Sequence, residues 1–309
     1  MRTAIIDMGT NTFHLLIVGQ EENSYEILLR DRLPVRIGVG GINQNVITKE
    51  GVSRAVNALV QFKNKMEGFG ITDIFAFGTS ALRNAENSRE VILKIKEATG
   101  IETKIISGDE EAQYIYEGVN LALKLNQEKS LIIDIGGGSV EFIIGNGEKI
   151  FWKQSFEIGA QRLLERFQKH DPILSSEIEA VEKFFKESLS TLFDAMKIHA
   201  PKTLAGSSGT FDTLSDIYCI QSGIAQKDSA ETPLTIEAFE KIYPEIISKN
   251  RDERMRIPGM IEMRVDMIVV ACCLVKFILD SFCFNQIRVS SYSLKEGVLA
   301  SLIKRNSKV

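Results

Sequence analysis

The sequence lacks the features that mark membrane proteins and general nucleic-acid binders. None of its apolar runs is long enough to cross a bilayer. The first apolar run is interrupted by Asp7, which argues against a signal peptide. A formal net charge of −4 gives no support for wholesale affinity to nucleic acid or to membrane surfaces. We therefore expect a cytoplasmic protein with neither kind of partner.

Cysteine and histidine are scarce, and neither is spaced for a metal site. Two of the four cysteines, Cys272 and Cys273, are adjacent in an apolar run, and no pair of CxxC elements occurs. The three histidines, His14, His170 and His199, are scattered along the chain. A zinc site is therefore not expected, and the cysteines are predicted to be small buried residues kept reduced.

The most informative feature is a repeated segment. Residues 4–19 read AIIDMGTNTFHLLIVG, and residues 131–145 read LIIDIGGGSVEFIIG. The alignment pairs Asp7 with Asp134, Gly9 with Gly136, Asn11 with Gly138 and Thr12 with Ser139. A strand–turn–strand unit with small residues at its turn brings backbone N–H groups close to an anion. Two such units predict a duplicated fold that clamps an anion, and hence phosphate chemistry.

The order of predicted elements is mixed α/β. Each half reads as three strands, a helix, a strand and a helix, which differs from the strict alternation of a dinucleotide-binding fold. A length of 309 residues is enough for two domains, and a polar stretch near residues 125–128 separates the halves. We expect domains at 1–126 and 127–309, one helix over 175–198 and a polar, flexible loop over 224–233.

A third small-residue turn reads AGSSGT at 205–210, after a short strand and before a helix. Its backbone N–H groups would face an anion at the helix N-terminus. Its candidate binding residues are Gly206, Ser207, Gly209 and Thr210. No turn in the chain matches the P-loop or the dinucleotide fingerprint, so neither of those sites is expected.

Several charged residues have two interpretations. The acids at 109–111 open a helix, where they would complement its dipole, but a carboxylate there could also orient a water molecule. Glu141 alternates onto the strand face of Ser139, as a metal or water ligand or as an exposed strand residue. Arg83 and Arg264 could grip phosphate oxygens or form surface ion pairs.

Seven motifs in order give the chain a family resemblance. They read IDMGTNTFHLLI (6–17), FGTSALRNAEN (77–87), ISGDEEAQYIYEGV (106–119), IDIGGGSVEFIIG (133–145), IGAQRL (158–163), AGSSGT (205–210) and SLKEGVL (293–299). The sequence resembles the exopolyphosphatase / guanosine pentaphosphate phosphohydrolase family of the actin, Hsp70 and sugar kinase superfamily. That resemblance implies two ribonuclease-H-like domains around a cleft. Whether the last helix, about 294–305, packs back on the first domain is not fixed by the resemblance. It also implies a homodimer and Mg²⁺-dependent hydrolysis of a terminal phosphoanhydride.

The same resemblance assigns roles to individual residues. Glu111 would be the catalytic base, while Asp134 and Glu141 would handle the metal and the water. The resemblance also marks substrate-binding positions, which are Asp7, Gly9, Thr10 and Asn11 in the first loop, Gly136, Gly137, Gly138 and Ser139 in the second, and the cleft-lining Arg83 and Arg264.

Small departures from the family pattern bear on the substrate. Thr10 and Thr12 stand where the family commonly has serines, and Lys295 stands where it usually has arginine. Longer relatives carry additional domains that hold long polyphosphate, so processivity is not implied here. Polyphosphate is the first predicted substrate and guanosine pentaphosphate the second. The alternatives are a kinase or ATPase with its nucleotide on residues 206–210, and a non-catalytic sensor of such ligands.

Overall fold

The computed structural model describes residues 2–21, 24–225 and 229–306. It divides into two compact units, Met1–Glu111 and Ala112–Val309, and the division falls inside helix α4 (Gly108–Leu123). The domain boundary predicted at residues 126/127 lies farther along the chain and stays a prediction. Each unit is built on one mixed sheet with its own hydrophobic core.

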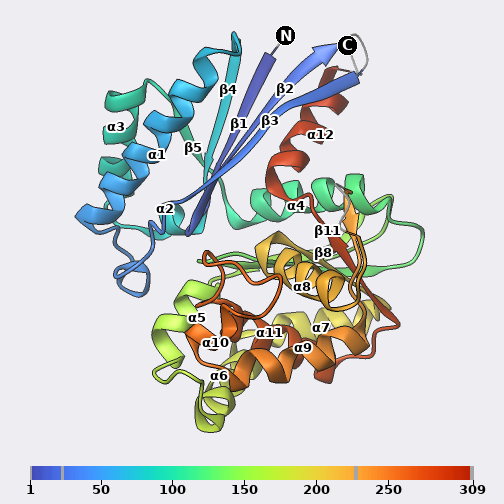
Figure 1. Ribbon diagram of the computed structural model, residues 1–309. Helices are drawn as coiled ribbons and strands as arrows, with labels where there is room; N and C mark the ends of the chain where they lie inside the picture. Colours follow the sequence, from blue (N-terminus) through green and yellow to red (C-terminus); the bar gives the residue numbers. More distant parts are fainter. Residues whose placement is uncertain (1, 22–23, 226–228, 307–309) are drawn as a thin grey trace. The chain divides into compact units, whose positions relative to one another are not determined.

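The first unit contains a five-stranded sheet with the order β3-β2-β1-β4-β5. Its strands are β1 (Arg2–Met8), β2 (Thr12–Glu21), β3 (Ser24–Pro34), β4 (Asp73–Gly78) and β5 (Thr103–Ile105). The first three strands pair antiparallel, and β4 and β5 continue the sheet in parallel with β1. The helices are α1 (Lys49–Glu67), α2 (Ser80–Asn84) and α3 (Ser88–Thr99), with a short 3-10 turn at Ile42–Gln44. Helices α1 and α3 pack side by side (Figure 1).

The second unit contains a six-stranded sheet with the order β10-β11-β9-β6-β7-β8. Its strands are β6 (Ser130–Ile135), β7 (Val140–Gly145), β8 (Ile150–Phe156), β9 (Thr203–Ser207), β10 (Glu231–Thr232) and β11 (Gln286–Ser290). Its helices after α4 are α5 (Ala160–Phe167), α6 (Ser175–Ser188), α7 (Ser190–His199), α8 (Ser208–Gln221), α9 (Ile236–Ser248), α10 (Arg251–Arg254), α11 (Ile268–Ser281) and α12 (Leu294–Asn306).

The two sheets share one topology, which confirms the predicted duplication at the level of the backbone. In each, three antiparallel strands are followed by two parallel ones, and the second unit adds β10 at the edge. Even the bulge recurs, because the register shifts between Ile17 and Val18 in one unit and between Ile144 and Gly145 in the other. The two halves are therefore alike in detail and not merely in strand count.

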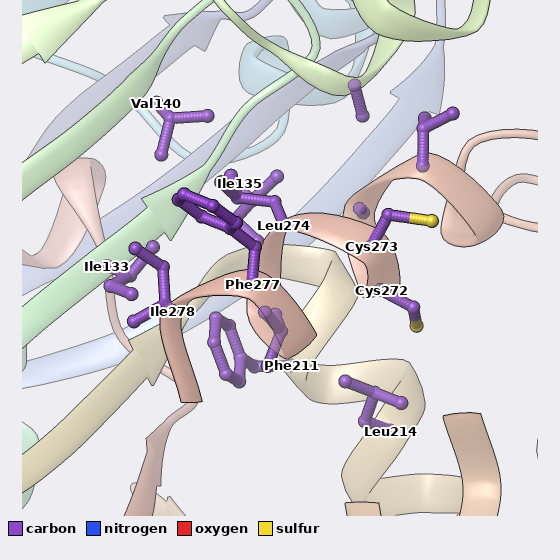
Figure 2. Packing of buried hydrophobic residues seen from close by; sticks show 14 of the residues in the cluster. Ile133, Ile135, Val140, Phe211, Leu214, Cys272, Cys273, Leu274, Phe277 and Ile278 are labelled. Atoms are coloured by element: carbon purple, nitrogen blue, oxygen red, sulfur yellow. The ribbon is translucent and has the colours of Figure 1, made fainter. Parts of the chain in front are cut away.

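Helix α11 forms the centre of the second core. Apolar side chains surround it, as expected for a helix buried on all sides. Figure 2 shows Cys272, Cys273 and Phe277 of this helix among side chains of β6 and α8. Burial raises the pKa of the Cys272 thiol well above its usual value, so this cysteine is held as an inert thiol. The prediction of buried cysteines is wrong for Cys283, which is exposed.

Two predicted elements differ from the structure. The helix expected over 175–198 is two helices, α6 and α7, separated at the fully buried Leu189. No glycine or proline marks this break, so tertiary packing sets it. The loop expected over 224–233 contains β10, a two-residue strand that exists through pairing with β11. Residues 226–228 of that loop lie outside the described residues. Across the described ranges, no helix is both long and apolar enough to span a membrane.

Candidate phosphate-binding turns and acidic residues

The turn between β6 and β7 presents its backbone N–H groups toward one side. The carbonyls of Gly136, Gly137 and Gly138 accept hydrogen bonds of 2.9–3.1 Å from the N–H groups of Ala160, Gln161 and Gly159 at the start of α5. In a trans peptide, a carbonyl and the next N–H point in opposite directions. The N–H groups of residues 137–139 therefore point away from α5, as an anion-binding turn requires.

Glycine is needed where this turn meets α5. A Cβ atom at Gly159 would overlap the backbone carbons of Gly137 and Gly138. Arg162, one turn into α5, adds a hydrogen bond of 2.9 Å from its Nε to the carbonyl of Gly138. The turn is thus fixed from one side by backbone and side-chain donors, which leaves its opposite side for a ligand.

The turn between β1 and β2 repeats this construction with different partners. Gly9 N–H donates to the Thr12 carbonyl at 3.2 Å, as Gly136 N–H does to the Ser139 carbonyl at 3.0 Å. The Asn11 carbonyl accepts from the N–H groups of residues 35 and 36, and the Thr10 carbonyl accepts from that of residue 38. The segment after β3 therefore orients the first turn as α5 orients the second.

The two sheets carry different side chains across the strands behind these turns. In the second unit Asp134, Glu141 and Ser155 are direct partners across β6, β7 and β8. In the first unit the corresponding row contains Asp7 and His14, followed by an arginine on β3. In this row, a pair of adjacent carboxylates occurs only in the second unit.

Asp134 is buried and surrounded by serine hydroxyls. Its carboxylate accepts hydrogen bonds from Ser207 Oγ at 2.6 Å, Ser208 Oγ at 2.7 Å and Ser293 Oγ at 2.5 Å. These serines come from the β9–α8 and β11–α12 junctions, so one carboxylate joins three segments of the unit. Ser208 has a φ of 69°, which is uncommon for a residue with a Cβ and recurs at functional sites.

Glu141 is almost completely buried, with 1% of its surface exposed, so the interpretation as an exposed strand residue is wrong. Its carboxylate accepts a hydrogen bond of 2.6 Å from Ser155 Oγ. Because it lies directly opposite Asp134 in the strand pair, its side chain is on the same face of the sheet. Two buried carboxylates side by side repel each other unless a cation or a proton intervenes.

Arg264 lies against the third turn. Its guanidinium occupies the space that a Cβ at Gly209 would need. The same arginine, together with Gly136, Gly137 and Thr210, lines a small cavity. The second and third turns and Arg264 therefore lie together within one unit.

The neighbouring acids Glu110 and Glu111, in the first turn of α4, have different partners. Glu110 and Ser107 form a capping box, with the Glu110 carboxylate 3.0 Å from Ser107 N–H and Ser107 Oγ 3.1 Å from Glu110 N–H. The pKa of the Glu110 carboxyl is lowered, mainly by a hydrogen bond from the Lys104 side chain and next by the hydrogen bond from Ser107 N–H. Glu111 has no part in this box. It is 7% exposed and forms an ion pair of 2.7 Å with Arg83.

Arg83 is itself mostly buried in the first unit. Its side chain is 16% exposed, and Nη1 also lies 3.3 Å from the carbonyl of Ile106. Helix α2, which carries Arg83, begins where Thr79 N–H donates to the Met8 carbonyl at the end of β1. The interpretation of Arg83 as one half of a surface ion pair is therefore wrong, because its partner is the buried Glu111.

The carboxylate pair fits a hard divalent cation. Oxygen donors are what Mg²⁺ prefers, and it is commonly held by one or two carboxylates together with substrate phosphates. Among the described residues there is no cluster of three or more histidine, cysteine, aspartate or glutamate side chains that could hold a metal. Asp134 and Glu141 are the two donors that the row supplies.

Four contacting residues carry no individual assignment from the sequence: Ser208, Ser293, Ser155 and Arg162. Three of them lie within the motifs AGSSGT, SLKEGVL and IGAQRL. Their partners are distant in the sequence, so the motifs mark the segments without revealing the contacts.

Comparisons with known proteins identify the family of this chain. The model of the Ppx/GppA phosphatase family matches residues 16–306. The crystal structure of an exopolyphosphatase from Cytophaga hutchinsonii ATCC 33406 is 41% identical, covers 98% of each chain and superposes with a TM-score of 0.95. An Aquifex aeolicus member of the Ppx/GppA family is 25% identical, with a TM-score of 0.79 over 99% of this chain and 98% of its own.

These similarities extend over nearly the whole chain and confirm the predicted fold of duplicated ribonuclease-H-like domains. The chain belongs to the Ppx/GppA phosphatase family and is an enzyme of the phosphatase class of hydrolases.

Proposed function

We propose that this enzyme removes the terminal phosphate of inorganic polyphosphate, with guanosine pentaphosphate as the alternative substrate. The observation that carries the proposal is the β6–β7 turn, whose N–H groups point together beside two buried carboxylates. A terminal phosphate group offers three anionic oxygens to such donors. The 41% identity to an exopolyphosphatase supports polyphosphate as the first candidate.

Within the second unit, the residues divide into anion and cation groups. Backbone N–H groups of Gly137, Gly138 and Ser139 would hold phosphate oxygens, with Arg264 and the turn at residues 206–210 as further donors. Asp134 and Glu141 would hold a divalent cation, for which we propose Mg²⁺. When bound, such a cation neutralises charge on the terminal phosphate.

Within the first unit, Glu111 would accept a proton from the attacking water. The ion pair with Arg83 keeps this carboxylate oriented while it is buried. We propose that Asp7, Gly9, Thr10 and Asn11 bind substrate through the first turn, and that Arg83 contributes positive charge to the same reaction. Catalysis then depends on positioning and electrostatics.

The test is phosphate release from purified protein on long polyphosphate, short polyphosphate, guanosine pentaphosphate and ATP, with and without Mg²⁺. We expect Mg²⁺-dependent release from polyphosphate and little from ATP. Preferential release from guanosine pentaphosphate would exchange the two substrates. Saturable binding without any release would contradict hydrolysis of these substrates and favour a sensor, and consumption of ATP only with an acceptor would favour a kinase.

The homodimer and the cellular compartment expected from the sequence stay predictions. Sedimentation of the purified protein over a range of concentrations would test the first of them.

A further inference from the structure

Arg264 lies in a segment that has little regular structure of its own. Between α10 and α11, residues 255–267 form a series of turns. Turn hydrogen bonds hold the backbone there: Arg264 N–H donates to the Ile261 carbonyl, and the Arg264 carbonyl accepts from Ile268 N–H at the start of α11, both at 3.0 Å. The Arg264 guanidinium lies over Gly209.

Arg254, the last residue of α10, contacts this segment from a buried position. It is only 1% exposed and is among the largest fully buried side chains. Its Nε donates to the carbonyl of Val265 at 3.0 Å, immediately after Arg264. Its Nη1 donates to Asp171 Oδ1 at 2.6 Å and to the Lys249 carbonyl at 2.5 Å. One buried guanidinium thus joins the Arg264 segment to two other parts of the chain.

Asp171 completes the arrangement. While one of its oxygens accepts from Arg254, the other accepts from the N–H of Arg251 at 2.7 Å. Arg251 pairs in turn with the side chains of Asp266 at 3.1 Å and Glu262 at 3.6 Å. The ion pairs of Arg251 are largely exposed to solvent, whereas the Arg254 side chain is enclosed. Replacing Arg254 should therefore disturb this segment more than replacing Arg251.

We propose that Arg254 is a positioning residue that orients Arg264 for binding of the phosphate group. This inference rests on the proposed function, in which Arg264 binds the phosphate group. It assigns no chemistry to Arg254 itself. The planar guanidinium donates in two directions at once, to a carbonyl on one side and to a carboxylate on the other. Lysine can reach one of these acceptors but cannot reproduce the fork.

The test is a double-mutant cycle that combines Arg254→Lys with Arg264→Gln. Alone, Arg254→Lys should lower kcat/KM on polyphosphate by about 10- to 100-fold, the cost of misplacing a binding group by about 1 Å. It should also weaken inhibition by inorganic phosphate, which probes anion binding without turnover. In the Arg264→Gln background, the same change should cost less than about threefold.

Arg251→Gln is the matched control, since it removes the exposed arginine of the same helix and should change kcat/KM by less than about threefold. Melting temperatures are measured for every variant. If Arg254→Lys does not fold, the cycle is run with Asp171→Asn, which removes the charge of the partner at its more exposed position.

Equal losses in both backgrounds would mean that Arg254 affects kcat/KM independently of Arg264, and would overturn the positioning role. An Arg264→Gln variant with unchanged kcat/KM and unchanged phosphate inhibition would overturn the inference as well. Neither result would affect the proposed hydrolysis, which fails only if the wild-type protein releases no phosphate.

Discussion

Adjacent carboxylates at positions 110 and 111 allow the catalytic hypothesis to be separated from helix capping. Replacing Glu111 with glutamine should lower kcat on the true substrate by at least ~100-fold, because an amide cannot accept the proton of the attacking water. Replacing Glu110 with alanine should leave kcat unchanged and lower the free energy of unfolding by about 0.5–1 kcal/mol, because alanine cannot accept the capping-box hydrogen bond from Ser107 N–H. The measurements are steady-state phosphate release and urea unfolding.

Near-wild-type turnover by Glu111→Gln would remove this residue from the mechanism. A comparable loss of kcat in Glu110→Ala would show that the integrity of the α4 N-terminus, and not a particular carboxylate, limits the rate.

Ser208 combines backbone strain with a hydrogen bond to Asp134, and two substitutions distinguish them. Ser208→Ala removes the hydroxyl and keeps a Cβ at a φ of 69°, whereas Ser208→Gly removes both. Glycine should therefore be more stable than alanine by about 1 kcal/mol, measured by chemical denaturation. If the hydroxyl matters for function, both variants should lose the same activity. Activity restored in the glycine variant would instead assign the effect to strain.

At the scale of elements, α4 and α12 cross with their backbones in close approach. A Cβ at Gly297 would overlap the carbonyl of Tyr114, and one at Gly118 would overlap the carbonyl of Ser293. Gly297→Ala should therefore force the helices apart and destabilise the protein by about 1–3 kcal/mol. Gly68→Ala is the control, because a Cβ at position 68 meets no atom within 4 Å. Equal melting temperatures for the two variants would contradict a tight crossing.

The elements also show what a sequence can and cannot reveal. The repeat around Asp7 and Asp134 predicts the duplication. Two turns of the same backbone geometry select glycine at the same first position and apolar residues in the strands on either side. The break at Leu189 is not predictable, since local propensity favours one helix and only packing divides it. The contacts of Ser208 and Ser293 with Asp134 are not predictable for a related reason: nothing local in a serine shows which distant carboxylate it will contact.

At the scale of the whole molecule, the candidate residues are distributed over two compact units, with Glu111 in one and Asp134 in the other. We expect both to act on the same chemical step. When groups act as a unit, removing the second costs little after the first is lost. Glu111→Gln and Asp134→Asn should therefore each lower kcat severely. The kcat of the double variant should lie within about tenfold of the kcat of the less active single variant.

The cycle is measured by phosphate release from polyphosphate at saturating Mg²⁺, with circular dichroism to establish that all three variants are folded. Ser155→Ala is a suitable companion, because it alters the partner of Glu141 without removing a carboxylate. If the two losses multiply in the double variant, Glu111 and Asp134 contribute independently, and the proposal that a single reaction uses both units is wrong. Strong non-additivity would support the proposal that Glu111 and Asp134 act in the same chemical step.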